Sequence, residues 1–459
     1  MKDVLERAVD KAMELGAEYA DVRVQRTYSN TIRIVNGRVE RTIPSVELTA
    51  SIRVLKGTWG FSSLTSISET DLLEAVDKAF KTAKVGAERI PEPVKIKEVK
   101  PVEDKVRLGD IQDPREIPIE EKMEIIFECD KAARSIDTRI VRTDYNYRDS
   151  VKEKYFCSSE GSYIEEIIPF TELRIVVVAR EGKVIQQTIG RIAASAGQEL
   201  MAYADPLEVS ERLAQDAVKL LSAKSPPSGR YPVVVDNGIT GLIALSTGLM
   251  TSAYFALMPE SELGSFAGKL GQKVCSEAIT LTDDPTSAGM PVIFHYDEEG
   301  IAAEPVNMIE SGVLKTYIHS RETAYKFNAE PRGHSRAPNA LFQPKPIVSN
   351  AIIKSSDLSF EELIEDVKEG IYLRGVVGAT IGRIIQCTTM MGYRIVNGEI
   401  GEPLKGATFI VDASKDLFNV DAVANDFDVL PLRLIEGDKF YPVSGGGPHM
   451  KFKELKIGG

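Results

Sequence analysis

The spacing of apolar and polar positions predicts a mixed α and β architecture for the first half of the chain. In four stretches, apolar side chains recur about every 3.6 residues, which is the period of a helix with one buried face. In seven other stretches apolar and polar side chains alternate, as they do in half-buried strands. The predicted helices cover residues 4–15, 69–84, 120–133 and 206–223. The predicted strands cover residues 20–34, 39–43, 46–55, 139–144, 151–157, 162–166 and 170–179.

The order of these elements predicts how the chain divides into domains. The sequence helix, strands, helix occurs twice, so we predict two similar α+β units at about 1–88 and 120–224. Five prolines lie among charged residues over 89–119, a composition typical of an extended linker. The polar, helix-breaking segment 225–229 then separates an N-terminal α+β domain, residues 1–224, from a C-terminal domain, residues 225–459.

The second half is predicted to be a β-rich domain of the barrel or sandwich type. Its predicted strands are short, glycines recur, and only residues 238–254 and 360–368 favour longer helices. Asn397-Gly398, like Asn36-Gly37 in the first half, favours a tight hairpin turn because both residue types accept a positive φ. The glycine run 445–447 lacks the Lys-Ser/Thr pair of a phosphate-binding loop, so we expect it to let a strand approach another backbone closely.

Composition and charge exclude several classes of function. The 459 residues carry a net charge of −12, which argues against nucleic acid as a partner because phosphate binding needs a basic face. The sequence has no apolar run long enough to span a bilayer, and its first residues are charged and lack an apolar signal core. We therefore expect a cytoplasmic protein without a membrane partner. The cysteines, which we expect to be buried thiols, are Cys129, Cys157, Cys275 and Cys387.

A series of short motifs gives the chain a specific resemblance. The motifs are Gly268-Lys-Leu-Gly-Gln272, Asp283-Asp284, Tyr296-Asp-Glu-Glu-Gly300, Glu310-Ser-Gly-Val-Leu-Lys315, Gly392-Tyr-Arg-Ile-Val-Asn-Gly398 and Pro403-Leu-Lys-Gly-Ala-Thr408. In this order and spacing they resemble the TldD/PmbA (TldE) family of zinc-dependent peptidases and their partner subunits. The resemblance extends over nearly the whole chain. It implies a peptidase-related protein that handles small or unfolded peptides.

The zinc motif of the catalytic members is missing from this sequence. Those members resemble one another in a His-Glu-x-x-x-His helix, and an ungapped match puts Thr247, Gly248 and Ser252 at its three key positions. Their late cysteine is also absent, with Ile435 near its place. A zinc hydrolase needs His or carboxylate ligands and a Glu that activates water. We therefore predict no metal cofactor and no peptidase activity of the chain alone.

Five residues of the second half are candidates for contact with a peptide. The segment Asp297, Glu298, Glu299 and Gly300 resembles an acidic segment beside the family's peptide cleft, and a solvated acidic turn is the alternative. His334 has arginines on both sides and has the chemistry to bind a carboxylate, with a polar loop as its alternative.

A metal site with ligands other than the family's is a third alternative. On a strand, His295 would share a face with Asp297 and Glu299 and could hold a metal with them.

The leading hypothesis is a TldD/PmbA-family subunit that lacks the zinc motif and takes part in proteolysis or peptide maturation. It is either a PmbA-type chain or a TldD-type chain that has lost its ligands. Its partner would be a zinc-bearing TldD-type subunit or a second copy of itself. One alternative is a homodimeric, non-catalytic peptide-binding protein, and another is a hydrolase that uses His295 and Asp297 as ligands.

Overall fold

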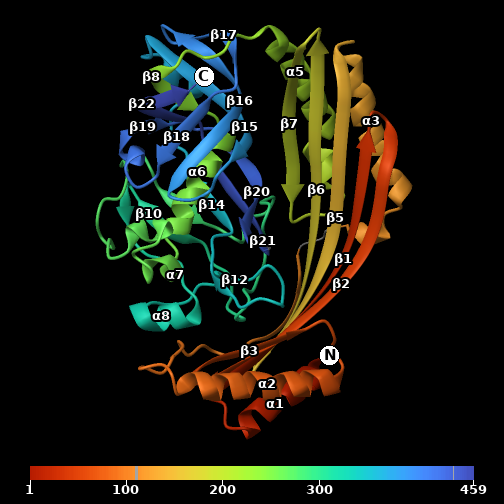
Figure 1. The fold of residues 1–459 in the computed structure, drawn as a ribbon, viewed down its shortest axis with the longest axis vertical. Coiled ribbons are helices and arrows are strands. Elements are labelled where there is room, and N and C mark those ends of the chain that lie inside the picture. The colour runs from red at the N-terminus through yellow and green to blue at the C-terminus, as the bar shows by residue number, and fades with distance from the viewer. Residues whose placement is uncertain (109–111, 438, 459) are drawn as a thin grey trace.

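Four long strands form the frame of the N-terminal half (Figure 1). In the computed structural model, which describes residues 1–108, 112–437 and 439–458, a seven-stranded sheet has the order β3-β2-β1-β5-β6-β4, and β7 also pairs with β6. Strands β1, β2, β5 and β6 have 17, 19, 19 and 19 residues, so each extends over about 60 Å. The strands are β1 (Tyr19–Val35), β2 (Arg38–Lys56), β3 (Thr58–Leu64), β4 (Glu103–Arg107), β5 (Ile140–Ser158), β6 (Tyr163–Glu181) and β7 (Val184–Ala194).

The predicted short strands are wrong in one respect, because the structure joins them into continuous strands. Residues 39–43 and 46–55 belong to one strand, β2. In the same way, the segments predicted at 139–144 and 151–157 are joined in β5, and those at 162–166 and 170–179 are joined in β6. The prolines in two of the gaps between the predicted strands lie where the sheet has an open edge. Pro44 precedes the part of β2 that pairs with β3, and Pro169 lies between the parts of β6 that pair with β4 and β7. A proline without a neighbouring strand on one side removes no ladder hydrogen bond.

Helices cover one face of this sheet at its two ends. Helices α1 (Lys2–Glu14) and α2 (Glu69–Ala87) pack at one end, and α3 (Ile119–Ser135) and α5 (Pro206–Ser222) at the other (Figure 1). In β1, Val22 and Val24 face the first pair, and Ile32 and Ile34 the second. All four have the same parity, so both helical cores lie on one face of the sheet. The short helical segments here are η1 (Pro114–Glu116) and α4 (Leu200–Tyr203).

The C-terminal half contains a closed barrel, as the β-rich prediction allowed. Strands β15, β8, β22, β18 and β16 pair in that order, and a further pairing of β15 with β16 closes the ring. A six-stranded sheet of order β11-β10-β9-β14-β21-β20 lies beside it. The barrel and its attached strands are β8 (Gly229–Val235), β15 (Glu369–Ala379), β16 (Ile384–Val396), β17 (Glu399–Lys405), β18 (Thr408–Asp412), β19 (Val420–Val423) and β22 (Met450–Gly458).

The remaining C-terminal elements are short, apart from one helix at the centre of the largest hydrophobic core. That helix is α6, and every residue from Ile239 to Met250 is buried. The other strands are β9 (Leu281–Asp283), β10 (Val306–Glu310), β11 (Val313–Leu314), β12 (Ser335–Arg336), β13 (Lys345–Pro346), β14 (Asn350–Ile353), β20 (Asp428–Glu436) and β21 (Lys439–Gly447). The helices are α6 (Asn237–Met250), α7 (Ala253–Ala256), η2 (Glu262–Phe266), α8 (Arg321–Phe327), α9 (Phe360–Ile364) and η3 (Asp416–Asn419).

Two glycines bring α6 and β21 into backbone contact, which confirms the interpretation of the glycine run. A Cβ on Gly241 would lie 2.3 Å from the carbonyl oxygen of Gly445, and a Cβ on Gly445 would lie 1.7 Å from that of Gly241. Only a residue without a side chain fits at either position. Both hairpin predictions are confirmed too, since the Asn and Gly of each turn have positive φ. Among the described residues, no helix is both long and apolar enough to cross a membrane.

Candidate functional site

A cavity of about 530 Å³ lies between the helix-free face of the long sheet and the C-terminal half. Its floor consists of alternate residues of five adjacent strands, β2, β1, β5, β6 and β7, and of Ser195 just after β7. Side chains two positions apart on a strand share a face. On β5 these residues have even numbers, whereas the odd-numbered Tyr145 and Tyr147 pack under the helices. The floor residues are Gln25, Thr27, Glu47, Arg148, Ser150, Lys152, Lys154, Ile168, Phe170, Glu172, Arg191, Ala193 and Ser195.

The roof of the cavity comes from the C-terminal half. Its three parts are residues 291–298, residues 336–342 and the facing segments of β20 and β21. Arg433 of β20 donates to Glu172 over 2.6 Å, and the same carboxylate pairs with Arg191 over 3.2 Å. This shared carboxylate ties the roof to the floor at one end of the cavity.

At the other end, Glu298 lies between cations of the sheet. Its carboxylate pairs with Lys154 at 3.3 Å and with Arg23 at 3.3 Å, and Lys154 also pairs with Glu166 at 3.2 Å. Burial disfavours the ionised carboxylate, but the attraction of Lys154, Arg23 and Lys152 outweighs it and lowers the pKa of Glu298 to about 2. Glu298 is therefore a fixed anion in the cavity wall.

The acidic segment that begins at Asp297 is a turn, not a strand. The Oδ1 atom of Asp297 accepts the N–H groups of Glu299, at 2.8 Å, and of Ile301, at 3.0 Å, and Oδ2 accepts the N–H of Ser335 at 2.9 Å. Burial and the neighbouring Glu299 raise the pKa of Asp297 to about 7. The idea that His295 and Asp297 share the face of a strand is wrong. Both Asp297 oxygens hold the turn, and the His295 ring lies 3.3 Å from Glu166 instead.

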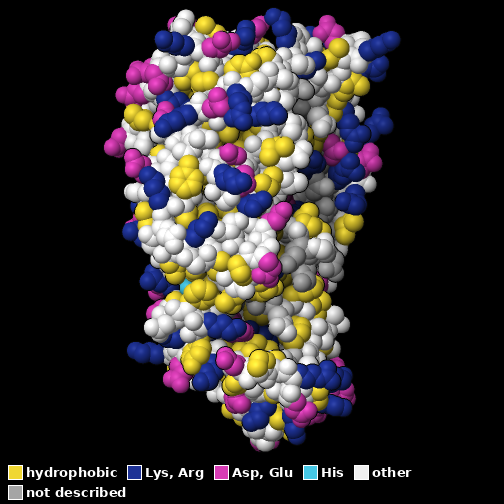
Figure 2. Space-filling model, turned by 60° about the vertical axis from the view of Figure 1, so that its left-hand side comes forward, with side chains coloured by type: hydrophobic (Ala, Val, Ile, Leu, Met, Phe, Trp, Pro, Cys, Tyr) yellow, Lys and Arg dark blue, Asp and Glu magenta, His cyan; other side chains and the backbone are white. Residues whose placement is uncertain are grey.

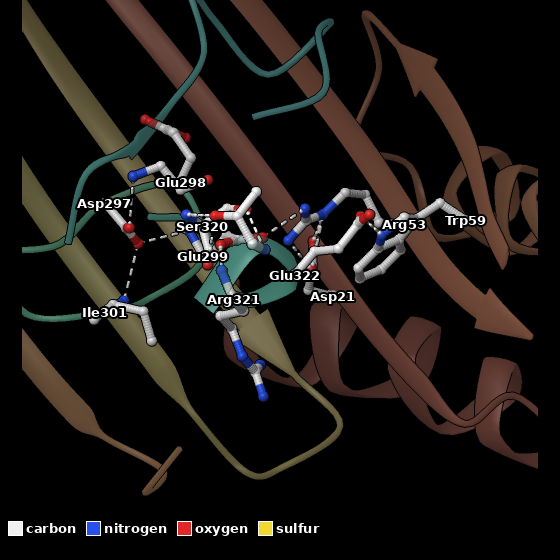
Figure 3. A network of polar contacts seen from close by, with 12 residues as sticks. Asp21, Arg53, Trp59, Asp297, Glu298, Glu299, Ile301, Ser320, Arg321 and Glu322 are labelled. Carbon is white, nitrogen blue, oxygen red and sulfur yellow. Dashed lines mark hydrogen bonds and ion pairs between the residues drawn. The ribbon is translucent and has the colours of Figure 1, made fainter. Parts of the chain in front are cut away.

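Glu299 connects the sheet to α8 through a buried polar network (Figure 3). Arg53 of β2 pairs with Asp21 of β1 at 2.6 Å and with Glu299 at 3.0 Å. The second oxygen of Glu299 accepts the N–H of Arg321, the first residue of α8, at 2.8 Å. Arg53 also lies over the ring of Trp59, the single tryptophan of the chain, at 4.7 Å from the ring centroid. This network fixes the acidic turn against the long sheet.

Gly300 and His334 lie behind the cavity wall. Gly300 has φ of +73°, and a Cβ there would lie 2.4 Å from the ring of Phe156. His334 is fully buried, with Nδ1 at 2.8 Å from Asp283 and Nε2 at 3.0 Å from the carbonyl oxygen of Glu304. Of the five peptide-contact candidates, Asp297 and Glu298 line the cavity, whereas Glu299, Gly300 and His334 lie outside its lining.

The three positions matched to the zinc motif lie in the core around α6. Thr247 donates its hydroxyl to the carbonyl oxygen of Ile243 over 2.8 Å, and Ser252 donates to that of Pro346 over 2.6 Å. A Cβ on Gly248 would already be tight, at 3.1 Å from Ala351. Two occupied hydroxyls and a glycine do not fit a zinc ion, which takes imidazole, thiolate or carboxylate ligands.

The described residues contain no other set of side chains that could bind a zinc ion in place of the missing motif. No group of three or more His, Cys, Asp or Glu side chains there is arranged to hold a metal ion. Ile435, near the place of the family's late cysteine, is 63% exposed. On the face that Figure 2 shows, basic and acidic side chains are interspersed among apolar ones. The cavity is therefore the feature that most favours a ligand.

The fold and the site together define a two-part protein with a polar cavity between a long sheet and a barrel-containing half. Three successive family matches cover most of the chain: PmbA/TldA metallopeptidase domain 1 over residues 20–83, the central domain over 112–223 and the C-terminal domain over 228–459. The chain belongs to the PmbA/TldD metallopeptidase family, as its motifs indicated.

Relatives and solved structures agree with this assignment. A metalloprotease of Methanothermobacter thermautotrophicus is 35% identical, with 96% of each chain covered. A zinc metalloprotease TldD homolog of Saccharolobus solfataricus is 26% identical, with 98% of this chain and 99% of the relative covered. The structure of TldE from Thermococcus kodakarensis has a TM-score of 0.76 at 18% identity and covers 99% of this chain and 100% of its own, which shows a shared fold.

Sequence reasoning missed the basic floor of the cavity. Arg148, Lys152 and Lys154 have the even numbering that puts all three on one face of β5. The alternation was visible in the sequence as a polar stretch inside a strand. Arg148 was missed because residues 145–150 were interpreted as a break between two strands, whereas Lys152 and Lys154 lie within the strand predicted over 151–157 and their shared face was not considered.

Proposed function

We propose that this chain is a zinc-less TldD-type subunit that binds extended peptides in the cavity and supports a zinc-bearing relative in peptide cleavage. The observation that carries the proposal is the chemistry at Thr247, Gly248 and Ser252. The family is described as metallopeptidases, yet none of these residues is a metal ligand here. The hydroxyls of Thr247 and Ser252 each donate to a backbone carbonyl oxygen, and Gly248 has no side chain. Without ligands for a metal, the chain has no means to lower the pKa of an attacking water.

The cavity supports the peptide-binding part of the proposal. Its volume of about 530 Å³ falls within the usual range of ligand pockets. Ile168 and Phe170 give it apolar contact surface, and Asp297 and Glu298 give it polar groups held by backbone and ion-pair contacts. A peptide in this cavity would contact both halves of the molecule.

The relatives support a TldD-type origin over a PmbA-type one. The curated proteins that match over most of the chain include several named as metalloproteases or TldD homologs. A TldD-type chain that has lost its ligands would keep this similarity and the fold. It would act as partner to a zinc-bearing chain or pair with a second copy of itself.

The decisive experiment combines metal analysis with an activity assay. We expect the purified full-length chain to hold no stoichiometric zinc after dialysis and to leave an unfolded test peptide uncut. We expect cleavage to increase when a zinc-bearing TldD-type relative from the same cell is added, above the activity of that relative alone. One tightly bound zinc per chain, or chelator-sensitive cleavage by the chain alone, would refute the proposal.

A homodimeric peptide-binding protein is the second candidate, and the open edge of β2 favours it. Within the described ranges of the chain, residues 38–47 of β2 pair with β1 and with no other strand. They are exposed, with Val46 65% exposed. Such edges are commonly covered by another chain. We expect a dimer in light scattering at micromolar concentration, and a stable monomer would count against it. Peptide binding without any stimulation of a zinc-bearing relative would favour this candidate over the first.

A further inference from the structure

The wall of the cavity carries an excess of positive charge in an otherwise acidic protein. Six cationic and four acidic side chains line it, although the chain as a whole has a net charge of −12. We propose that Arg148 and Lys152 of β5 form an anion-binding subsite that selects peptides with acidic side chains. This inference rests on the proposed peptide-binding function and names the class of peptide.

Five of the ten charged side chains of the cavity wall lie in ion pairs with one another. Glu172 is shared between Arg191 and Arg433, and Glu298 is held by Lys154. These carboxylates are therefore already occupied by cations, and they lie at the two ends of the cavity. The charges that remain for a ligand are those between the two ends.

Arg148 and Lys152 lie in that middle part. Among the residues that the structure describes, neither side chain has a hydrogen bond or an ion pair. Arg148 stands opposite Glu172 in the pairing of β5 with β6, but Glu172 already serves two arginines of the cavity wall. Lys152 stands opposite Ile168, which offers no charge. Both cations line a space that is large enough for a ligand. Neither forms a direct ion pair, although Glu172 and Glu47 attract Arg148 and Glu298 attracts Lys152 from a greater distance.

Arg336 of the roof adds to the positive charge. It donates to the carbonyl oxygens of Val348, at 2.7 Å, and Pro442, at 2.6 Å. These two contacts hold the guanidinium in place, and neither brings its charge to a carboxylate. A carboxylate between floor and roof would then face three guanidinium or ammonium groups. Charge-assisted hydrogen bonds of this kind are the strong ones in proteins.

The spacing of the two floor cations fits an extended peptide. Arg148 and Lys152 are four residues apart on one face of β5, so their Cα atoms are about 13 Å apart. Ser150 lies between them and stands opposite Phe170. In an extended peptide that runs along β5, side chains four residues apart have the same spacing. The best ligand would carry two acidic residues at that separation with a small or apolar residue between them.

The titration of Lys152 gives this subsite a dependence on pH. Burial lowers the pKa of Lys152 to about 8, while Glu298 and Glu166 favour the charged form and Lys154 and Arg336 oppose it. A bound carboxylate would favour the charged form further. Peptide affinity should therefore fall as the pH rises above 8, because the empty subsite then loses its ammonium charge.

The test measures binding of two matched ten-residue peptides to the full-length chain by fluorescence anisotropy. One fluorescein-labelled Gly/Ser peptide carries two Glu residues four positions apart, and the other carries Gln at both. We expect the Glu peptide to bind at least about tenfold more tightly at low salt. Arg148→Gln and Lys152→Gln should each remove a large part of this preference, and the double variant should abolish it. Lys131→Gln, an exposed charge change on α3, is the matched control and should leave it intact.

The pH series adds a readout that general electrostatic attraction would not give. In Lys152→Arg the charge persists at high pH, so the loss of affinity above pH 8 should disappear. Circular dichroism and the emission of the single tryptophan check that each variant is folded. Equal binding of both peptides, unchanged in the variants, would overturn the subsite and leave peptide binding standing. Failure of both peptides to bind the unaltered chain would overturn the proposed function and the subsite together.

Discussion

The contact between α6 and β21 makes a sharp prediction about stability, which is that Gly445→Ala strongly destabilises the C-terminal core. The new Cβ would lie 1.7 Å from the carbonyl oxygen and 2.4 Å from the carbonyl carbon of Gly241. Ordinary contact begins at 3.4 Å, so helix and strand must separate by about 1.7 Å. Because both obstructing atoms belong to the backbone, no side-chain rotation relieves the clash.

The expected loss of stability depends on how many packing contacts of α6 are lost when the helix moves away from β21. Helix α6 is buried from Ile239 to Met250 within the largest hydrophobic core. Overpacking usually costs about 1–3 kcal/mol when side chains can adjust. Here the whole helix moves, and a gap of even 1 Å loses up to about half of each dispersion contact along it. We therefore expect a loss of about 4 kcal/mol in the free energy of unfolding, a large part of the total for most domains.

Urea unfolding followed by circular dichroism measures this loss, and hydrogen exchange of peptides from α6 and β21 shows where it occurs. The matched control is Gly378→Ala in β15. A Cβ at Gly378 meets no atom within 4 Å and its backbone has no positive φ, so its unfolding should change by less than about 0.5 kcal/mol. A Gly445→Ala protein that unfolds within 0.5 kcal/mol of the unaltered chain would refute the reasoning, since the close backbone contact would then be absent.

Two further substitutions test the seam between the halves. Arg53→Leu leaves the carboxylates of Asp21 and Glu299 buried without their main cation, which should destabilise the protein by about 3–5 kcal/mol and shift the emission of the tryptophan beside it. A variant with unchanged emission and stability would show that this network does not hold the halves together. Gly300→Ala strains a backbone at φ of +73° and drives a Cβ into Phe156, so thermal unfolding should occur at a clearly lower temperature, by a loss of about 2 kcal/mol or more. An unchanged melting temperature would contradict the geometry of the acidic turn.

Local pattern was enough to predict much of the fold. The period of apolar residues located α2 and α5 within three residues of their observed ends, because each buries one clear face on the sheet. The Asn-Gly turns were predictable from two residues, since few other pairs accept positive φ at both positions. The barrel-type C-terminal half followed from short strands and frequent glycines.

Contacts between distant parts of the chain were beyond such reasoning. Arg53 and Glu299 are separated by 246 residues, and nothing in the period of either segment indicates that they meet. The same holds for Arg433 and Glu172, which close one end of the cavity. Asp297 was predicted as a candidate for contact with a peptide, but that its carboxylate binds backbone N–H groups depends on the three-dimensional turn.

The continuous strands of the N-terminal sheet have a consequence for how this protein is made. Because β1, β5 and β6 each contribute side chains to both helical cores, neither core can be completed without strands that also belong to the other. During synthesis the β1–β2 hairpin emerges early, and β5, which begins at Ile140, follows only about 80 residues after β2 ends at Lys56. Until then the edge of β1 stays unpaired and open to other nascent chains. We expect truncations that end before β5 to aggregate, and the intact sheet to form late and as a single cooperative unit.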